Sequence, residues 1–367
     1  MFSLLAGKVD VSRFMTKTAV DLAQCAAGTA AVLSPDSNNQ LAWLELQNKL
    51  ETFNLFAHID VELDLLQDGA CLREVIARAL CLGPYRSVWA MEGVGHWYVE
   101  LDDSATARIN LKAEADTLPA SSLIPLHSGA GLSFAERCLE TTTDRHTDAQ
   151  VRTTLQRFVA LCNEKSHGAY VGAAYEALGL VTRNLHPHLL PQIDQHLAEI
   201  DEELVSYFWH GVGRGLYFAP TNFLLLGENS RSLMAHVQQE SLHEAARLNT
   251  LSGLIWALVL VNIRHPQILE TFIGANLDEL DREIFAGALC SAIAVWHHSS
   301  PDKRQLVALW RHRPSDIRVA EFWNAYVIEP SSRMVDHYYP TVRQAGLGWL
   351  FRHRSLSELF IGEERCE

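Results

Sequence analysis

Six apolar segments each contain a glycine flanked by small or aromatic residues, and they recur along most of the chain. The glycines are Gly93, Gly129, Gly172, Gly211, Gly253 and Gly287, at successive spacings of 36, 43, 39, 42 and 34 residues. Glycine costs a helix about 0.8 to 1 kcal/mol relative to alanine, so its repeated use indicates helices packed too closely for a side chain. The spacing is typical of two-helix repeats. We therefore predict an all-α helical-hairpin repeat array, either an α-solenoid or a closed α/α ring, with the glycine-rich helices inside.

The segments between the glycines have amphipathic patterns. Residues 147–161, 190–204 and 232–248 carry apolar stripes with charged opposite faces, as expected of outer helices of the same hairpins. We assign residues 1–84 to an N-terminal helical region, with a helix over 14–33, and residues 85–367 to the helical-repeat domain. The two are expected to pack as one continuous unit. The least regular stretch, 101–122, is expected to be an extended loop or a mobile flap.

Charge and apolar runs exclude several classes of partner. The formal net charge is -14 without any block of like charges, which argues against nucleic acid as a partner. The longest apolar run, 251–263, is shorter than the roughly 20 residues of a membrane span. The seven cysteines are scattered, which is typical of reduced thiols in apolar helices. We predict a cytoplasmic protein without a membrane span, and the sequence leaves open a monomer or a homodimer.

Aligning the six segments on their glycines singles out two of them. The residue before the glycine and the residue four positions later share one helix face. These positions are strongly polar in two segments, as Glu92 with His96 and as His210 with Arg214. An unpaired buried carboxylate would take up a proton, so Glu92 needs a cation or several donors. Arg214 is the natural partner, because its guanidinium binds a carboxylate through two bonds.

These polar residues permit two interpretations. They form either a structural network or the polar floor of an interior pocket with aromatic walls. In the second case Glu92 or His210 is the candidate general base and Arg214 holds an anionic group. The candidate ligand-binding residues around them are His96, Trp97, His127, Trp209 and Tyr217.

Metal and nucleophile motifs are weak. Glu164–His167 and Glu240–His243 have the Glu-x-x-His spacing of carboxylate-bridged di-iron bundles. Two such pairs are close to the number that chance gives in this composition, so we assign no metal ligands, and the sequence leaves any cofactor unknown. A di-metal, oxygenase-like helical enzyme remains an alternative. The sequence has no nucleophile elbow and no Walker phosphate loop.

The glycine motifs resemble one known family. Glu92-Gly-Val-Gly, His127-Ser-Gly-Ala-Gly, His210-Gly-Val-Gly-Arg-Gly-Leu-Tyr-Phe and Leu251-Ser-Gly-Leu occur in the order typical of the UnbL-type family of bacterial proteins, over about residues 85 to 275. That family is of unknown function and is often encoded beside enediyne polyketide gene clusters. The resemblance implies a role in bacterial specialised metabolism, with Glu92, His127 and Arg214 as matching polar positions.

Three functions follow as hypotheses. The first is an accessory or tailoring protein of specialised metabolism that binds an apolar or anionic small molecule in an interior pocket, or that binds a pathway protein. The second is an enzyme that uses Glu92 or His210 as general base with Arg214. The third is a protein-interaction scaffold with an inert interior.

Overall fold

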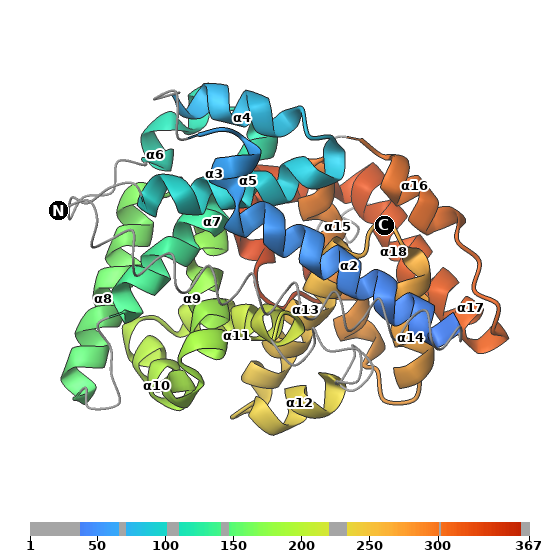
Figure 1. Cartoon of the computed structure of the whole chain (residues 1–367). Coiled ribbons are helices and arrows are strands. Elements are labelled where there is room, and N and C mark those ends of the chain that lie inside the picture. Colours follow the sequence, from blue (N-terminus) through green and yellow to red (C-terminus); the bar gives the residue numbers. More distant parts are fainter. Residues whose placement is uncertain are drawn as a thin grey trace, which may run out of the picture.

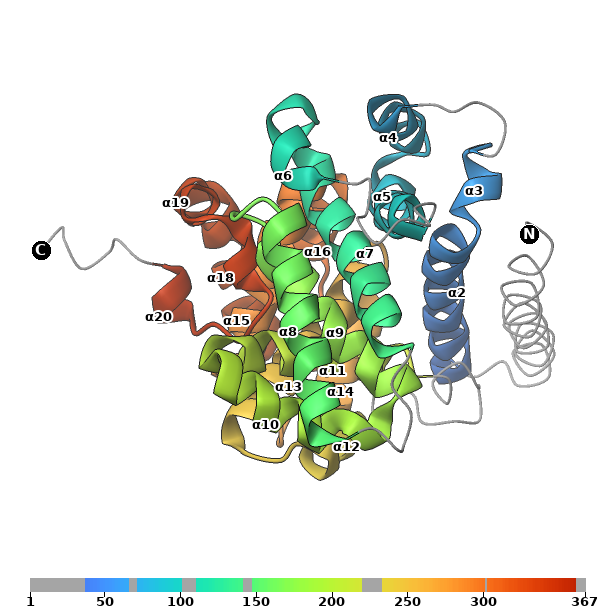
Figure 2. The same cartoon turned by 90° about the vertical axis from the view of Figure 1, so that its left-hand side faces the viewer.

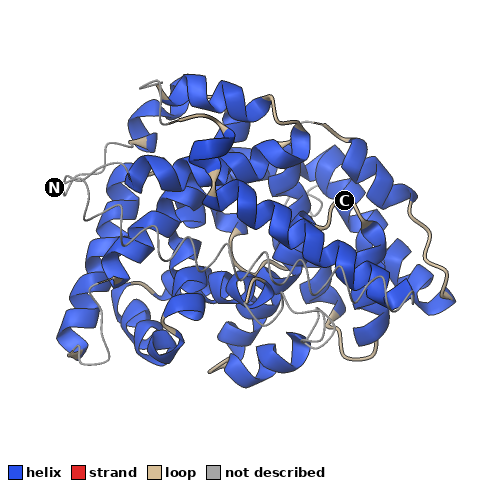
Figure 3. Cartoon of the chain, viewed as in Figure 1, coloured by secondary structure: helices blue, strands red, loops and turns tan. Residues whose placement is uncertain are grey.

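The described part of the protein is built of helices joined by short turns. The computed structural model describes residues 37–65, 71–100, 110–140, 147–219, 233–300 and 302–360. In these ranges every regular element is an α-, 3-10 or π-helix, and Figure 3 shows no strand among them. The predicted all-α class is confirmed. The helix predicted over 14–33 lies outside the described residues.

The elements follow one another at short intervals. The α-helices are α2 (Ser37–Ala57), α3 (Ile59–Glu62), α4 (Leu72–Leu80), α5 (Pro84–Glu100), α6 (Leu111–Glu114), α7 (Ala120–Leu139), α8 (Asp148–Lys165), α9 (Val171–Leu185), α10 (Leu190–Ile200), α11 (Glu202–Tyr217), α12 (Leu233–Glu240), α13 (Glu244–Val261), α14 (Pro266–Asn276), α15 (Arg282–Ser299), α16 (Arg304–Arg311), α17 (Ile317–Trp323), α18 (Glu329–Arg333), α19 (Tyr339–Ala345) and α20 (Leu356–Leu359). The 3-10 and π-helices are η1 (Ala115–Thr117), η2 (Pro187–Leu189), η4 (Asn324–Ile328), η5 (Met334–Tyr338) and η6 (Leu347–Leu350).

The glycine-rich helices pack against one another in chain order. Helix α5 contacts α7, α7 contacts α9, α9 contacts α11, α11 contacts α13, and α13 contacts α15. Helix α15 also contacts α7, so the last of these helices returns toward the second. In Figure 1 they occupy the middle of the molecule, with α8, α10 and α12 outside them. The turned view in Figure 2 places α2 on one side and α18 to α20 on the other.

The glycines are where the helix backbones touch. A β-carbon built on Gly129 would lie 1.8 Å from the carbonyl oxygen of Glu92, and one on Gly211 would lie 1.9 Å from that of Glu176. On Gly253 it would lie 1.9 Å from the carbonyl oxygen of His210. No side chain fits at such separations, so the predicted reason for these glycines is confirmed. The same contacts hold polar side chains of neighbouring helices at close range.

Two of the predicted outer helices are shorter than the apolar pattern indicated. The pattern over 190–204 is divided at Asp201, whose extended backbone ends α10 and whose side chain accepts the Glu203 N–H at the start of α11. The pattern over 232–248 is divided at His243, whose ring accepts the Ala246 N–H at the start of α13. In both cases a side-chain cap satisfies free N–H groups and starts a new helix although the apolar spacing continues.

The stretch predicted to be irregular, 101–122, contains helices in its described part. Residues 101–109 lie outside the described part, but α6 and η1 occupy Leu111 to Thr117. Helix α7 then begins at Ala120. The Asn110 side chain accepts the Ala113 N–H and so starts a helix that the composition did not indicate.

The C-terminal segment crosses the glycine-rich helices. The Gly348 carbonyl abuts Gly172 of α9, and the Arg354 carbonyl abuts Gly287 of α15. Between them Phe351 is completely buried, with its ring centroid 5.4 Å from that of Trp256 and 6.3 Å from that of His210. The segment therefore closes over the polar residues that the glycine motifs carry.

Among the described residues, α13 is the helix with the length and apolar character of a membrane span. Its apolar window is 78% buried inside the protein, as in a core helix of a protein in water. The thiols of Cys138, Cys162 and Cys290 are also buried, as predicted, whereas Cys71 and Cys81 are exposed because they lie at the two ends of α4.

Candidate functional site

A buried ion-pair network centres on Arg214 of α11. Its Nη1 donates to Glu176 Oε2 at 3.0 Å and to Ser128 Oγ at 3.0 Å, and its Nη2 donates to Glu92 Oε1 in a short contact. The Ser128 hydroxyl in turn donates to Glu92 Oε1 at 2.7 Å. The predicted pairing of Glu92 with Arg214 is present, and four successive glycine-rich helices contribute to it.

His210 extends the network by one residue. Its Nδ1 lies 3.2 Å from Glu176 Oε1, and its ring makes T-shaped contacts with those of Trp256 and Phe351. One turn separates His210 from Arg214, so both reach the α9 side of α11. His210 and Arg214, the pair identified in the sequence, therefore both contact the Glu176 carboxylate.

The network is strongly charged although it is enclosed. Side-chain exposure is 8% for Glu92, 4% for Arg214, 1% for His210 and zero for Glu176. Burial opposes the charge of Glu176, but Arg214 and His210 together outweigh it and lower the pKa of this carboxyl. Burial likewise opposes the charge of Arg214, and the two glutamates outweigh it and raise the pKa of the guanidinium.

Glu176 was missed because the glycine alignment was out of register in α9. The predicted equivalents were Val171 and Tyr175, from alignment on Gly172, but that glycine lies against the backbone of Gly348 and the Tyr207 ring, and not against the backbone of a neighbouring glycine-rich helix. In each of the three cases a glycine of the next glycine-rich helix touches the backbone carbonyl of the polar residue. Glu92, Glu176 and His210 therefore occupy equivalent positions on their helices. The sequence signal is a small residue after the polar one and a glycine two positions later, as in Glu176-Ala-Leu-Gly, Glu92-Gly-Val-Gly and His210-Gly-Val-Gly.

The predicted histidine neighbours lie outside this network. His127 is completely buried, and its Nδ1–H donates to the Leu123 carbonyl at 2.6 Å while Nε2 accepts the His167 N–H at 3.0 Å. Burial lowers the pKa of His127 to about 4, against the effect of the Leu123 carbonyl. His96 is partly exposed, and its Nε2 lies 2.9 Å from Glu136 Oε2.

The predicted aromatic wall is also dispersed. Trp209 is buried and its Nε1–H donates to Asp194 Oδ1 at 2.6 Å. Tyr217 is buried beside α2, where its hydroxyl accepts the Asn262 Nδ2–H at 2.7 Å. Trp97 is half-buried near the end of α5. Only Glu92, His210 and Arg214 of the eight predicted residues come together.

The two Glu-x-x-His pairs make unrelated contacts. Both carboxylate oxygens of Glu240 accept from Arg183, at 2.5 and 2.8 Å. His243 caps α13 and contacts Asp194. His167 Nδ1 accepts the N–H of Ala169 within its own turn. The side chains of Glu240, His243 and His167 are therefore each accounted for by a hydrogen bond or ion pair with another residue of the protein.

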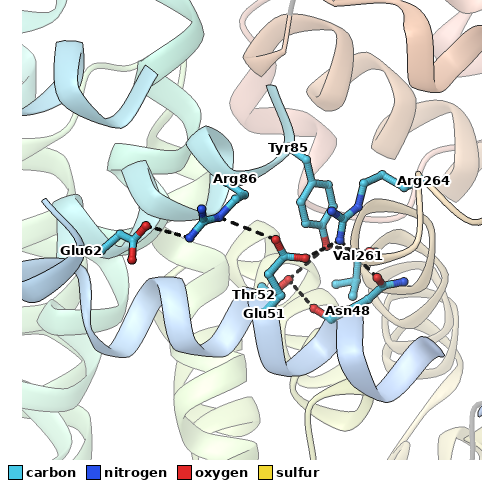
Figure 4. A network of polar contacts seen from close by, with 8 residues as sticks. All are labelled: Asn48, Glu51, Thr52, Glu62, Tyr85, Arg86, Val261 and Arg264. Carbon is cyan, nitrogen blue, oxygen red and sulfur yellow. Dashed lines mark hydrogen bonds and ion pairs between the residues drawn. The ribbon is translucent and has the colours of Figure 1, made fainter. Parts of the chain in front are cut away.

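An exposed groove lies at the N-terminal end of α5. Its volume is about 430 Å³, and it is lined by Leu82, Gly83, Pro84, Tyr85, Arg86, Arg264, Arg304, Gln305 and Ala308. The Arg264 guanidinium lies 3.6 Å above the Tyr85 ring and donates to Glu51 and Asn48 of α2. Figure 4 shows Arg86 reaching Glu51 from the other side, at 3.7 Å, while its Nη2 donates to Glu62 Oε1 at 2.7 Å. Carboxylates of Glu51 and Glu62 therefore order the two arginines. We call this the α5 groove.

A second groove shares a wall with the first. It has a volume of about 530 Å³ and is lined by Asp302, Lys303, Arg304, Val307, Ala308 and Arg311. Arg304 and Ala308 line both grooves, so α16 forms the ridge between them. Basic side chains therefore gather on this side of a protein whose overall formal charge is -14.

The fold and these sites define a helical protein with a closed, charged core and a basic surface groove. No protein-family model, no curated protein and no solved structure matches the chain.

Proposed function

We propose that this protein binds an anionic small molecule in the α5 groove and serves as an accessory protein of bacterial specialised metabolism. The observation that carries the proposal is the lining of the groove by three arginines, Arg86, Arg264 and Arg304. The described lining residues include no acid, although Glu62, Glu51 and Asp302 at its border pair with Arg86, Arg264 and Arg304. The chain has 14 more acidic than basic residues. The pathway assignment rests on the resemblance to the UnbL-type family, and the cytoplasmic location on the composition.

The groove supplies fixed donors for an anion. Arg264 is held by the Tyr85 ring and by Glu51, so its guanidinium loses little further freedom when a ligand binds. Residues 83 to 86 bring the first turn of the 17-residue helix α5 to the same surface. Free N–H groups and the positive end of a helix dipole favour a phosphate or carboxylate there.

The buried network favours a structural role over catalysis. Glu92, Glu176 and Arg214 bind one another, and Phe351 lies over His210, so a substrate would have to displace protein groups to reach a base. The enzyme hypothesis with Glu92 or His210 as base therefore requires opening of the core. We further infer that the glycine-rich helices form a closed helical-hairpin array, supported by the contact between α15 and α7.

The proposal is tested by calorimetric titration with inorganic pyrophosphate and with tricarboxylates such as citrate, at low and at high salt. We expect saturable binding at low salt that weakens as salt rises. Arg264→Gln should weaken it about tenfold or more, because a charge-assisted hydrogen bond is lost.

Arg247→Gln is the matched control. Arg247 is also paired with one glutamate, Glu244, and its side chain is 33% exposed against 29% for Arg264. Equal loss of binding in both variants, or no saturable binding of any of these anions, would overturn the assignment. Capture of a protein partner in the absence of anion binding would favour the scaffold hypothesis.

A further inference from the structure

Three potential metal ligands converge on one face of the α5–α7 pair. The ligand atoms of His96, Glu100 and Glu136 all lie within 4.8 Å of one another, and His96 Nε2 is 2.9 Å from Glu136 Oε2. His96 and Glu100 are four residues apart on α5, while Glu136 faces them from α7. Among the described residues, these three form the group of histidine, cysteine or acidic side chains whose ligand atoms lie this close to one another.

The backbone fixes this convergence. A β-carbon on Gly95 would lie 2.3 Å from the Leu126 carbonyl oxygen, so α5 and α7 are in backbone contact beside the cluster. Side chains that extend from two such helices toward the same surface have little freedom to separate. The three ligands therefore come from rigid elements, which favours a defined binding geometry.

Neighbouring groups orient Glu100. The Ser133 hydroxyl, itself buried, donates to Glu100 Oε1 at 2.5 Å. Arg137 Nε donates to the same oxygen at 3.3 Å. Hydrogen bonds of this kind fix carboxylate ligands in metal sites. The charge of Arg137 opposes a cation, and the two glutamates together outweigh it.

Other histidine–carboxylate pairs of the chain provide an internal comparison. His312 Nε2 lies 2.7 Å from Glu270 Oε2; His312 is as exposed as His96, at 20%, whereas Glu270 is 21% exposed against 38% for Glu136. Among the described residues, no third ligand converges on the pair at His312. A hydrogen-bonded pair alone explains His312, whereas the additional carboxylate of Glu100 distinguishes the cluster on α5 and α7.

We propose that His96, Glu100 and Glu136 form a binding site for a divalent transition-metal ion, with zinc the best match. One imidazole nitrogen and two carboxylates form a donor set that zinc accepts, and three protein ligands leave at least one position for water. The site lies apart from the α5 groove and does not depend on anion binding there.

The test uses Zn²⁺ alone in calorimetry and Co²⁺ alone as a spectroscopic probe. We expect one equivalent of Zn²⁺ to bind the full-length protein, and Co²⁺ to give a visible absorption band that Zn²⁺ abolishes. His96→Ala and Glu136→Gln should each weaken binding at least tenfold, and His312→Ala should leave it unchanged. Arg137→Gln should tighten binding, because a cation beside the metal is removed.

Two results would overturn the proposal. One is the absence of stoichiometric Zn²⁺ binding by the unaltered protein. The other is equal metal affinity in the His96→Ala and His312→Ala variants. Circular dichroism checks that each variant folds, and the exposed Glu100→Gln provides a further ligand variant if His96→Ala does not fold.

Discussion

The Arg214 guanidinium donates to the Glu176 carboxylate at 3.0 Å, from a glycine-rich helix to the one before it in the chain. Both side chains are buried, and Arg214 also reaches Glu92 two glycine-rich helices further back. One side chain thus connects α11 with α9 and α5. Glycine contacts set the helix separations, and this network fixes which faces meet.

Breaking the buried network should lower the free energy of unfolding substantially. Glu176→Gln leaves Arg214 with one carboxylate partner and removes the anion that His210 contacts. We expect a loss of about 3 to 5 kcal/mol in the free energy of unfolding, the usual result when one member of a buried pair is removed. Urea denaturation followed by circular dichroism measures it.

The matched control is Glu244→Gln, which breaks an exposed pair with Arg247. Solvent screens an exposed pair of this kind, so its loss should change stability little. Similar stability of the Glu176→Gln variant and the unaltered protein would contradict the structural role of the network.

Glycine substitutions should separate close helix contacts from simple helix propensity. Gly129→Ala places a methyl group 1.8 Å from the Glu92 carbonyl oxygen, so α5 and α7 must move apart. We expect a loss of several kcal/mol of stability, in the range of severe overpacking. Thermal unfolding of purified variants measures the difference.

Gly274→Ala is the corresponding control in α14. There the nearest atom to an added β-carbon is a Val319 methyl group at 3.5 Å, an ordinary contact. Alanine should stabilise this helix by up to about 1 kcal/mol, because it is the better helix former. The interpretation fails if the two substitutions have effects of the same sign.

The sequence predicted the helical class and the close approach of the glycines, because both follow from local spacing. It also predicted the pairing of Glu92 with Arg214, since a buried acid requires a cation. Glu176 was not predicted, because α9 carries two glycines and only the contact with Gly211 shows which one sets the register. The helix ends at Asp201 and His243 depend on single caps that the apolar pattern does not reveal.

The α5 groove and the cluster around His96 depend on tertiary contacts. Arg86 and Arg264 are far apart in the sequence and meet through Glu51 of α2. Glu100 and Glu136 come together because α5 and α7 touch at their glycines. His96 and Glu100 share a face of α5 at i, i+4, but no spacing along the chain links them to Glu136, or Arg86 to Arg264. Neither complete site was therefore predictable from the sequence.

Removing the Phe351 ring should test whether the C-terminal segment stabilises the core. Phe351 is completely buried against Trp256 and His210. Phe351→Ala should lower the free energy of unfolding by about 3 to 5 kcal/mol, since it removes a large apolar group and leaves a cavity. Ile317→Ala is the control, because that side chain is 73% exposed and should change stability little. Equal unfolding midpoints for the two variants would argue against a core role for the segment.

Stability should fall on acidification before most carboxylates titrate. In the folded protein His127 uses both ring nitrogens in the neutral form, and burial lowers its pKa from 6.5 to about 4. Between these values the unfolded chain binds more protons than the folded one, so the free energy of unfolding rises with pH. From His127 alone we expect a slope of up to about 1.4 kcal/mol per pH unit between pH 6.5 and about 4. Urea denaturation across this range measures the slope. His127→Gln should reduce the slope, although it also lowers stability at neutral pH; an unchanged slope would show that His127 titrates normally in the folded protein.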